Sequence, residues 1–234
     1  MVFAAIAAGG TGTRMGAELP KQFLELAGKP ILIRTAEAVA ETVDAVYIGV
    51  SPTWHKYTEE LLRQYNLPVT VRVVDGADNR MATILKITEE IEAERTVSDD
   101  DIILTHDAVR PFINNRIVLE NIEKCRAFGA CGTFVPCIDT MGISADGKLL
   151  NSVPSRNTMY NIQTPQTAKF SILKKAFEDN MCRLEAFTDL CGMLNSSGFA
   201  VAMAKGEYTN IKITTPADMT VARGIIGERK DANR

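Results

Sequence analysis

The sequence predicts an α/β fold in which a mostly parallel, Rossmann-like sheet is covered by helices on both faces and carries a projecting β-arm. Short apolar segments alternate with helical patterns over residues 1–136, and such alternation is typical of a parallel sheet. A glycine-rich loop follows the first apolar segment, as at a strand-to-helix turn. The alternation ends after Pro136, where the Asp146-Gly147 turn signal lies between two short apolar runs.

The expected strands are short and rich in apolar or β-branched residues. They are Val2–Ala7, Ala45–Val50, Thr70–Val74, Asp101–Thr105 and Ala130–Val135. Helical patterns lie between them, at Pro30–Val39, Trp54–Tyr65, Arg80–Glu94 and Asn115–Phe128. No linker or internal repeat divides the 234 residues, so we expect a single domain.

Residues 138–163 contain no helical pattern, and we expect them to form the β-arm. Because a two-stranded excursion is marginally stable alone, the arm should pack on something else, such as a second subunit. Two helices and a returning strand are expected after it, at Phe170–Asn180, Thr188–Ser196 and Phe199–Ala204. Thr215 and Pro216 have the pattern of a cap and first position of a last helix that reaches about Ile226, and the polar tail Gly227–Arg234 should fray.

Composition excludes several classes of function. The net charge of −3 provides no basic surface for nucleic acid, so an anionic substrate would need locally placed cations. No apolar run is long enough to span a membrane and the N-terminus lacks a signal-peptide pattern, so we expect a cytoplasmic protein. The five cysteines form no Cys-x-x-Cys pair and are expected to be buried free thiols, and neither histidine has the spacing of a zinc ligand.

The stretch from Ala7 to Lys21, AAGGTGTRMGAELPK, carries the clearest sign of chemistry. Its glycines let backbone N–H groups approach an anion, and Arg14 and Lys21 add two positive charges, so the loop is suited to a polyphosphate. It lacks the lysine of a Walker loop, and Met15 stands where a dinucleotide fingerprint has its third glycine. An ordinary strand-to-helix turn with incidental charges remains the alternative.

Two further turns follow expected strands, and ligands of such folds bind at the C-terminal ends of the strands. In one turn, Asp107 has the chemistry to hold Mg²⁺ or a sugar hydroxyl and Arg110 to contact a phosphate, unless the two simply pair and cap the next helix. In the other, Asp78, Asn79 and Thr83 can bind a base edge, or Asp78 or Asn79 can cap a helix instead.

No nucleophile–base pair accompanies these groups. Neither histidine has an evident partner in the sequence, and His106 is more typical of a structural hydrogen-bonder than of a base. Lys212 lies among β-branched residues, where an exposed edge charge and an inward phosphate contact are equally expected. If the attacking group is an anionic phosphate, no general base is required, and Arg, Lys and Mg²⁺ suffice to neutralise charge at phosphorus.

Seven motifs follow one another along nearly the whole chain: AAGGTGTRM, LPKQF, GADNR, THDAVRPF, RNTMYNIQTPQ, TDLCGM and GEYTNIKITTPADM. With them, the chain resembles the CTP-dependent cytidylyltransferases that act on polyol phosphates, a family of the nucleotide-diphospho-sugar transferase type. Members serve isoprenoid synthesis, with 2-C-methyl-D-erythritol 4-phosphate as acceptor, or teichoic-acid synthesis, with ribitol 5-phosphate. The resemblance implies CTP as a substrate, Mg²⁺ or another divalent cation, and a homodimer with exchanged arms.

The resemblance also implies a role for each matching position. The CTP phosphates would be wrapped by Ala7, Ala8, Gly9, Gly10, Thr11, Gly12 and Thr13, and the catalytic cations would be Arg14, Lys21 and Lys212. The cytosine and ribose would be bound by Ala77, Asp78, Arg80 and Thr83, with Asp107 near the ribose and the metal. The acceptor phosphate would be surrounded by Arg110, Thr140, Arg156 and Lys212, of which Thr140 and Arg156 would serve the neighbouring subunit.

Two departures from the family pattern bear on specificity. Gly76-Ala77-Asp78 replaces the Gly-Gly-Asp that is frequent in the base pocket, which costs little if the backbone angles at Ala77 are negative. Thr188-Asp189-Leu190-Cys191 differs from the TDEAS of the isoprenoid enzymes and favours ribitol 5-phosphate, with 2-C-methyl-D-erythritol 4-phosphate as the alternative. A non-catalytic nucleotide-binding module and a nicotinamide dehydrogenase are weaker readings, since the full set of cations and the imperfect glycine fingerprint argue against them.

Overall fold

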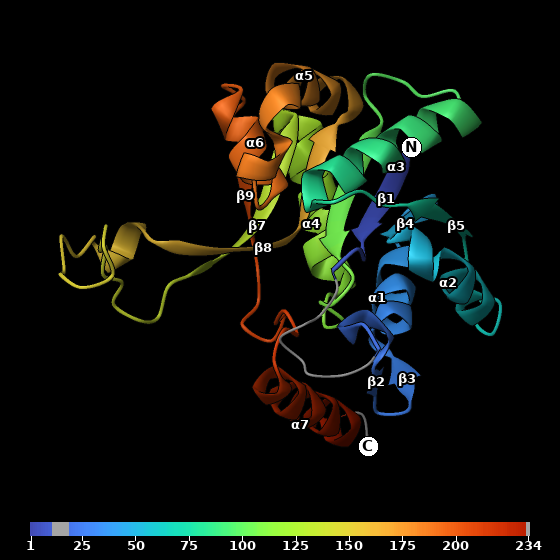
Figure 1. The fold of residues 1–234 in the computed structure, drawn as a ribbon, viewed down its shortest axis with the longest axis horizontal. Helices are drawn as coiled ribbons and strands as arrows, with labels where there is room; N and C mark the ends of the chain where they lie inside the picture. The colour runs from blue at the N-terminus through green and yellow to red at the C-terminus, as the bar shows by residue number, and fades with distance from the viewer. Residues whose placement is uncertain (11–18, 233–234) are drawn as a thin grey trace.

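A computed structural model of the chain describes residues 1–10 and 19–232. Over these residues the main sheet has seven strands in the order β5-β4-β1-β6-β8-β7-β9 (Figure 1). The strands are β1 (Val2–Ala7), β4 (Ala45–Val50), β5 (Thr70–Asp75), β6 (Ile102–Asp107), β7 (Ala130–Pro136), β8 (Tyr160–Lys169) and β9 (Ala202–Lys205). The α-helices are α1 (Ile31–Ala40), α2 (His55–Leu62), α3 (Arg80–Glu94), α4 (Asn115–Phe128), α5 (Phe170–Asn180), α6 (Leu190–Ser196) and α7 (Pro216–Ala232).

The sheet is mostly parallel, as the alternation of strands and helices predicts. The pairs β5–β4, β4–β1, β1–β6 and β7–β9 are parallel. Among the described strands of this sheet, only β8 runs the other way, because it lies between β6 and β7 and is antiparallel to both. The sequence pattern does not predict β8, since Gln163, Thr164, Gln166 and Thr167 give it no apolar alternation and Pro165 interrupts it.

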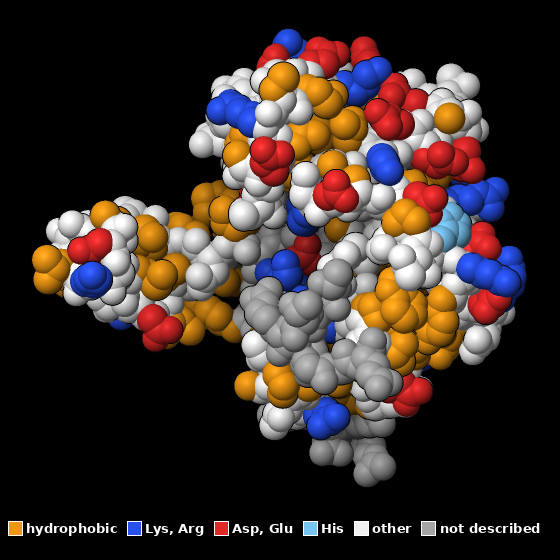
Figure 2. Space-filling view, viewed as in Figure 1, with side chains coloured by type: hydrophobic (Ala, Val, Ile, Leu, Met, Phe, Trp, Pro, Cys, Tyr) orange, Lys and Arg blue, Asp and Glu red, His pale blue; other side chains and the backbone are white. Residues whose placement is uncertain are grey.

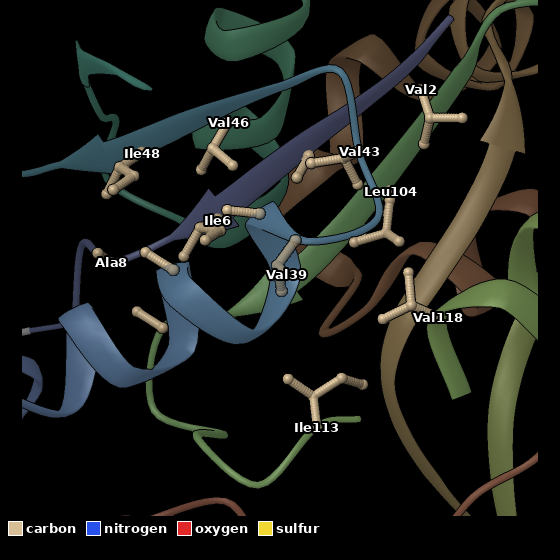
Figure 3. Close-up of a cluster of buried hydrophobic side chains, with 14 of the residues drawn as sticks. Val2, Ile6, Ala8, Val39, Val43, Val46, Ile48, Leu104, Ile113 and Val118 are labelled. Atoms are coloured by element: carbon tan, nitrogen blue, oxygen red, sulfur yellow. The ribbon is translucent and has the colours of Figure 1, made fainter. Parts of the chain in front are cut away.

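Helices cover both faces of the sheet, and each face has its own apolar core. One core joins β1 to α1 and α4 through side chains such as Ile6, Val39 and Val118 (Figure 3). The other core joins β1 to α3, α5 and α6 and contains, among others, Phe3 of β1 and Ile84 of α3. Successive residues of β1 therefore alternate between two buried faces, which explains why the strand is a continuous apolar run.

Several element bounds differ from the sequence expectation; β9, for instance, begins at Ala202 rather than Phe199. Three of the differences have local reasons. α2 begins at His55, because residues 52–54 form a separate 3-10 turn before it, and it ends at Leu62, because residues 63–65 leave the helix. α6 begins at Leu190, since the Asp189 carboxylate caps it by accepting the N–H of Gly192 at 2.8 Å. α7 continues to Ala232, so the expectation that the tail frays from residue 227 is wrong for residues 227–232, where no proline stops the helix.

A third, smaller core lies beneath the loops that carry the candidate functional residues. It contains Leu26, Ile31, Val109, Phe112, Ile213, Met219 and Ala222. Leu26 belongs to the two-residue strand β2 (Glu25–Leu26), which pairs with β3 (Lys29–Pro30), and Met219 and Ala222 belong to α7. The last helix therefore packs on the segments that follow Lys21, surround Arg110 and flank Lys212.

The arm extends from the β7–β8 pair, away from the rest of the molecule (Figure 1). Gly147 has a φ of +69° and the Asp146 carboxylate accepts the N–H groups of Lys148 and Leu149, so the predicted turn is present. An isolated bridge between Ile143 and Ser152, rather than a pair of strands, flanks this turn. Hydrophobic side chains are exposed along the arm (Figure 2), including Ile138, Met141, Ile143, Leu149, Leu150 and Val153.

The five thiols do not share one environment. Cys125, Cys131, Cys137 and Cys191 are buried as expected, and burial raises the pKa of Cys125 to about 11 and that of Cys131 to about 12. Cys182 is exposed in the 3-10 segment after α5, so the expectation of burial is wrong there. Within residues 1–10 and 19–232, no helix is both long enough and apolar enough to cross a bilayer.

Candidate active site

The three loops that the sequence singles out meet at one cavity of about 220 Å³, at the C-terminal ends of β1, β5 and β6. Figure 2 shows basic and acidic side chains side by side in a hollow near the middle of the molecule. The cavity is lined by Ala7, Ala8, Gly9, Gly10, Lys21, Gln22, Ala77, Asp78, Asn79, Arg80, Thr83, Asp107, Ala108, Val109 and Lys212. We call it the nucleotide cavity, because most of the residues that the resemblance assigns to CTP lie on it.

The glycine loop enters the nucleotide cavity directly from β1. The N–H of Ala8 donates to the Gly49 carbonyl at 2.8 Å, and Gln22 Nε2 donates to the Ala8 carbonyl at 2.6 Å, so the start of the loop is held from two sides. Lys21, with 9% of its surface exposed, reaches the same cavity from the 3-10 turn Lys21–Phe23. The predicted site residues Thr11, Gly12, Thr13 and Arg14 lie outside the described residues.

The expected base turn is held by hydrogen bonds at the start of α3. Asn79 caps the helix by accepting the Ala82 N–H at 2.8 Å, which confirms the capping alternative for this residue. The Thr83 hydroxyl accepts the Ala77 N–H at 3.0 Å and donates to the Asn79 carbonyl at 2.9 Å. Among the described non-glycine residues only Ala27 has a positive φ, so the extra methyl group of Ala77 is accommodated without backbone strain.

Asp107 is the charge centre of the site. It is the last residue of β6 and is nearly buried, and its carboxylate contacts Arg80 Nε at 3.0 Å, Lys212 Nζ at 2.9 Å and Arg110 Nε at 3.5 Å. Burial alone would raise the pKa of Asp107, but the three cations outweigh burial and hold that pKa well below its usual range. Asp107 is therefore ionised, and Lys212 reaches it from the cavity wall while 42% of the lysine side chain stays exposed.

The two arginines differ in how fully they are bonded. Arg110 donates to Asp107 and, through Nη1, to the Asn210 carbonyl at 2.8 Å, and burial lowers the pKa of this guanidinium. Arg80 donates through Nε, yet its buried Nη2 has no hydrogen-bond partner within the described part of the chain. Because an unpaired buried charged donor is costly, Arg80 is poised to bind an acceptor group in the cavity.

His106 is structural, as its position beside the strand end suggests. Its side chain is fully buried, Nε2 lies 3.1 Å from the Arg110 carbonyl, and burial lowers the pKa to about 4. A neutral imidazole held in this way cannot serve as a base at the cavity. The expectation that neither histidine has a partner is wrong, because His55 also contacts Asp75 at 2.7 Å across the β5 edge.

A second cavity, of about 180 Å³, adjoins the nucleotide cavity through Arg80, Asp107 and Lys212, which line both. Its other lining residues are Arg110, Ile162, Thr164, Gln166, Thr188 and Asp189. We call it the acceptor cavity. The sequence does not predict Thr164, Gln166, Thr188 or Asp189 as cavity residues. The first two lie on the unpredicted strand β8, and the last two precede α6, although the sequence pattern predicts a helix from Thr188.

Thr140 and Arg156 line neither cavity of their own chain. Both lie on the arm with exposed side chains, and Arg156 Nη1 donates to the Ile138 carbonyl at 3.3 Å. The structure therefore separates these two residues from the Arg110 and Lys212 side chains with which the resemblance groups them, as a role in a neighbouring subunit would require.

With this geometry in view, comparisons with known proteins identify the family. The chain matches the family model of 2-C-methyl-D-erythritol 4-phosphate cytidylyltransferase (IspD) over residues 2–228. The chain belongs to this family. The resemblance carried by the seven motifs is thereby confirmed, and so is the prediction of a cytidylyltransferase.

Solved structures agree with the IspD family in fold. The 4-diphosphocytidyl-2C-methyl-D-erythritol synthase of Anaerococcus prevotii is 28% identical, with a TM-score of 0.81 and coverage of 97% of this chain and 96% of that chain. The cytidylyltransferases of Thermus thermophilus and Francisella tularensis are each 24% identical, with TM-scores of 0.75 and 0.79. They cover 96% and 95% of this chain, and 98% of each of those chains is covered.

Proposed function

We propose that this protein transfers the cytidylyl group of CTP to 2-C-methyl-D-erythritol 4-phosphate and releases pyrophosphate. The observation that carries the proposal is the cluster of Arg80, Arg110 and Lys212 around Asp107, at the border between two adjoining cavities. Two phosphorylated substrates must meet in this reaction, and cations shared by two cavities suit such a meeting. The IspD family model and the structural relatives favour methylerythritol phosphate over ribitol 5-phosphate as acceptor.

In this proposal CTP occupies the nucleotide cavity. Ala7, Ala8, Gly9 and Gly10 lead the backbone along the triphosphate, and Lys21 neutralises its charge. The turn formed by Ala77, Asp78 and Asn79 faces the base. The unpaired Nη2 of Arg80 supports this arrangement, because a ribose hydroxyl or phosphate oxygen would supply its missing acceptor.

The acceptor occupies the second cavity, with its phosphate toward Arg110 and Lys212. An acceptor phosphate oxygen attacks the α-phosphorus of CTP in line, and a new P–O–P bond forms. The bond between the α-phosphorus and the oxygen bridging to the β-phosphorus breaks, and pyrophosphate leaves with its electron pair. No proton needs to be removed from the attacking group, so this reaction requires no general base.

A metal ion that arrives with the triphosphate would meet the Asp107 carboxylate, whose two oxygens pair with Arg80, Lys212 and Arg110. Asp107 is one ionised carboxylate, and the described residues contain no cluster of three metal-binding side chains. Mg²⁺ typically takes one or two protein carboxylates and completes its coordination with phosphate oxygens and water. Asp107 would supply the protein ligand, and bound Mg²⁺ would neutralise charge on the triphosphate.

Homodimerisation with exchanged arms completes the proposed assembly. Thr140 and Arg156 would then reach the acceptor cavity of the partner. The exposed apolar side chains of the arm support this, since a monomer would leave many large hydrophobic side chains in water.

Ribitol 5-phosphate is the competing acceptor, favoured by Thr188-Asp189-Leu190-Cys191, of which Thr188 and Asp189 line the acceptor cavity. Pyrophosphate release with CTP and Mg²⁺ should be compared for the two acceptors, each over a full concentration series. A higher kcat/KM for 2-C-methyl-D-erythritol 4-phosphate is expected. A higher kcat/KM for ribitol 5-phosphate would identify it as the acceptor and would show that the side chains before α6 determine which acceptor is bound.

A further inference from the structure

Asn210 does not line the acceptor cavity, but it is hydrogen-bonded to residues of β8 and to Arg110, which do line it or adjoin it. The side chain is fully buried, and its Nδ2 donates to the Thr164 carbonyl at 2.9 Å and to Gln163 Oε1 at 3.2 Å. Both neighbours are oxygen atoms, so the amide nitrogen must face them. The opposite atom, Oδ1, is buried without a partner among the described residues, an energetic cost that the two donated bonds have to offset.

These contacts form part of a closed ring around the charge centre. The Thr164 hydroxyl accepts the Asp107 N–H at 3.1 Å, and the Thr164 carbonyl accepts from Asn210. The Asn210 carbonyl accepts from Arg110 Nη1 at 2.8 Å, and Arg110 Nε contacts the Asp107 carboxylate at 3.5 Å. Asn210 also precedes Lys212 by two residues, so the segment it fixes carries a second cation of the cluster.

We propose that Asn210 is a positioning residue, which holds Arg110 and Lys212 in the arrangement that receives the acceptor phosphate. This inference rests on the proposed function. Hydrogen bonds from a rigid buried amide lock the Thr164 and Asn210 backbones together, and the Asn210 carbonyl then fixes the Arg110 guanidinium. Asn210 lines neither cavity, so it acts through its neighbours.

The kinetic test uses Asn210→Ala in the full-length protein. Misplacing Arg110 and Lys212 should lower kcat/KM for the better of the two acceptors by roughly ten- to a hundredfold, through a higher KM and a lower kcat. The KM for CTP should change less than the acceptor KM, because Ala77, Asp78 and Lys21 keep their positions, although Lys212 also lines the nucleotide cavity. Asn210→Ser, which keeps a hydroxyl donor, should fall between the wild type and Asn210→Ala and covers the case in which the alanine variant does not fold.

Asn180→Ala is the matched control. Asn180 is also a buried asparagine whose Nδ2 donates to two oxygen atoms, Ala176 O at 2.8 Å and Ser197 Oγ at 2.7 Å, and it lines neither cavity. Asn180→Ala should lose thermal stability without a selective change in the acceptor KM. If folded Asn210→Ala kept the wild-type acceptor kinetics, or changed the KM of both substrates equally, the positioning role would be overturned.

A chemical readout separates this inference from the proposed function. Phenylglyoxal modifies accessible arginines, and the Arg110 side chain is only 12% exposed in the wild type. Peptide mapping should show faster modification of Arg110 in Asn210→Ala, but not in Asn180→Ala. If Arg110 were protected equally in Asn210→Ala and in the wild type, the positioning role of Asn210 would be refuted even for an active enzyme. If the wild type released no pyrophosphate with either acceptor, only the proposed function would be refuted.

Discussion

At the residue scale, the position of Lys21 in the fold makes it a candidate catalytic residue. It leaves a 3-10 turn next to the glycine loop, and it is nearly buried on the wall of the nucleotide cavity. A positive charge in this low-dielectric position stabilises a developing pentacoordinate phosphorus more strongly than a solvated charge would.

Replacing Lys21 by alanine is therefore expected to lower kcat by roughly a hundred- to a thousandfold, with the fold intact. Steady-state pyrophosphate release measures the effect, and circular dichroism checks the fold. Lys174→Ala is the control, because Lys174 pairs with Glu92 on the surface and should be dispensable. Wild-type turnover in Lys21→Ala would remove this lysine from the mechanism.

His106 makes the stability of the protein depend on pH. Its pKa is lowered to about 4 in the folded state by burial, against an ordinary value near 6.5 in the unfolded chain. Between these two values the unfolded state takes up a proton that the folded state does not, so stability is complete above about pH 6.5 and falls as the pH decreases toward 4.

From pH 7 to pH 5, His106 should account for about 2 kcal/mol of lost unfolding free energy. Urea unfolding at both pH values measures the loss. A His106→Gln variant should lose less between the same two values, since its amide does not titrate. An equal loss in the variant and the wild type would mean that another group causes the dependence.

At the scale of elements, α7 and the third core organise the cationic side chains. Leu24 and Leu26 follow Lys21, Val109 precedes Arg110, and Ile211 and Ile213 flank Lys212, and all of them pack in or against this core. The N–H of Ile213 also donates to the Val109 carbonyl at 2.9 Å. The three segments that carry Lys21, Arg110 and Lys212 therefore pack on the same small hydrophobic core, to which α7 contributes Met219.

Met219→Ala is expected to destabilise the protein by about 2–3 kcal/mol, because it leaves a cavity in this small core. It should also reduce kcat at temperatures where the protein remains folded, since the supported segments lose their packing. Urea unfolding and turnover measure the two effects. Val221→Ala, at an exposed position of the same helix, should change neither by a comparable amount, and a Met219→Ala variant as stable as Val221→Ala would contradict the structural role.

The elements also show what the sequence can and cannot predict. α3, α4 and α5 and strands β1 and β4 have the predicted bounds, because each joins a clear apolar period to a recognisable end. β8 escapes prediction because its stability comes from pairing with β6 and β7 rather than from its own polar sequence. The acceptor cavity is lined by β8 and by the residues before α6, so half of its wall could not be foreseen.

The candidate site likewise contains residues that local sequence motifs predict and residues that only the tertiary structure brings together. Residues on local motifs, such as Gly10, Lys21 and Asp107, could be predicted because each motif directly follows a strand. The pairing of Asp107 with Arg80 and Lys212 joins residues 27 and 105 positions apart in the chain, and only the folded sheet brings them together. The role of Thr83 in bonding the Ala77 turn is likewise a tertiary property.

At the scale of the whole molecule, the arm is the feature that a single chain does not explain. It carries Thr140 and Arg156 away from the cavities of its own chain and exposes apolar residues such as Leu149 and Leu150. An exchanged-arm dimer would bury that surface and complete each acceptor cavity with residues of the other subunit.

Subunit mixing tests this assembly. Lys21→Ala and Arg156→Ala proteins, each impaired alone, should regain up to about a quarter of wild-type turnover after mixing, since half of the dimers would hold one intact site. A mixture of Lys21→Ala with Arg80→Ala is the control and should regain nothing, because both residues belong to the same subunit's cavity. If the first mixture showed no more activity than the sum of its two variants measured separately, the arm would not act in the partner's cavity.

The central claim, transfer of a cytidylyl group between two phosphorylated substrates, is tested most directly by ³¹P nuclear magnetic resonance. The protein, CTP and Mg²⁺ are followed with and without 2-C-methyl-D-erythritol 4-phosphate, and in parallel with ribitol 5-phosphate. The account predicts that an acceptor converts CTP to pyrophosphate and to a product with two coupled phosphorus signals, and that CTP alone is stable. CTP that is bound but unchanged with both acceptors, or hydrolysed to CMP at the same rate without them, would contradict the account.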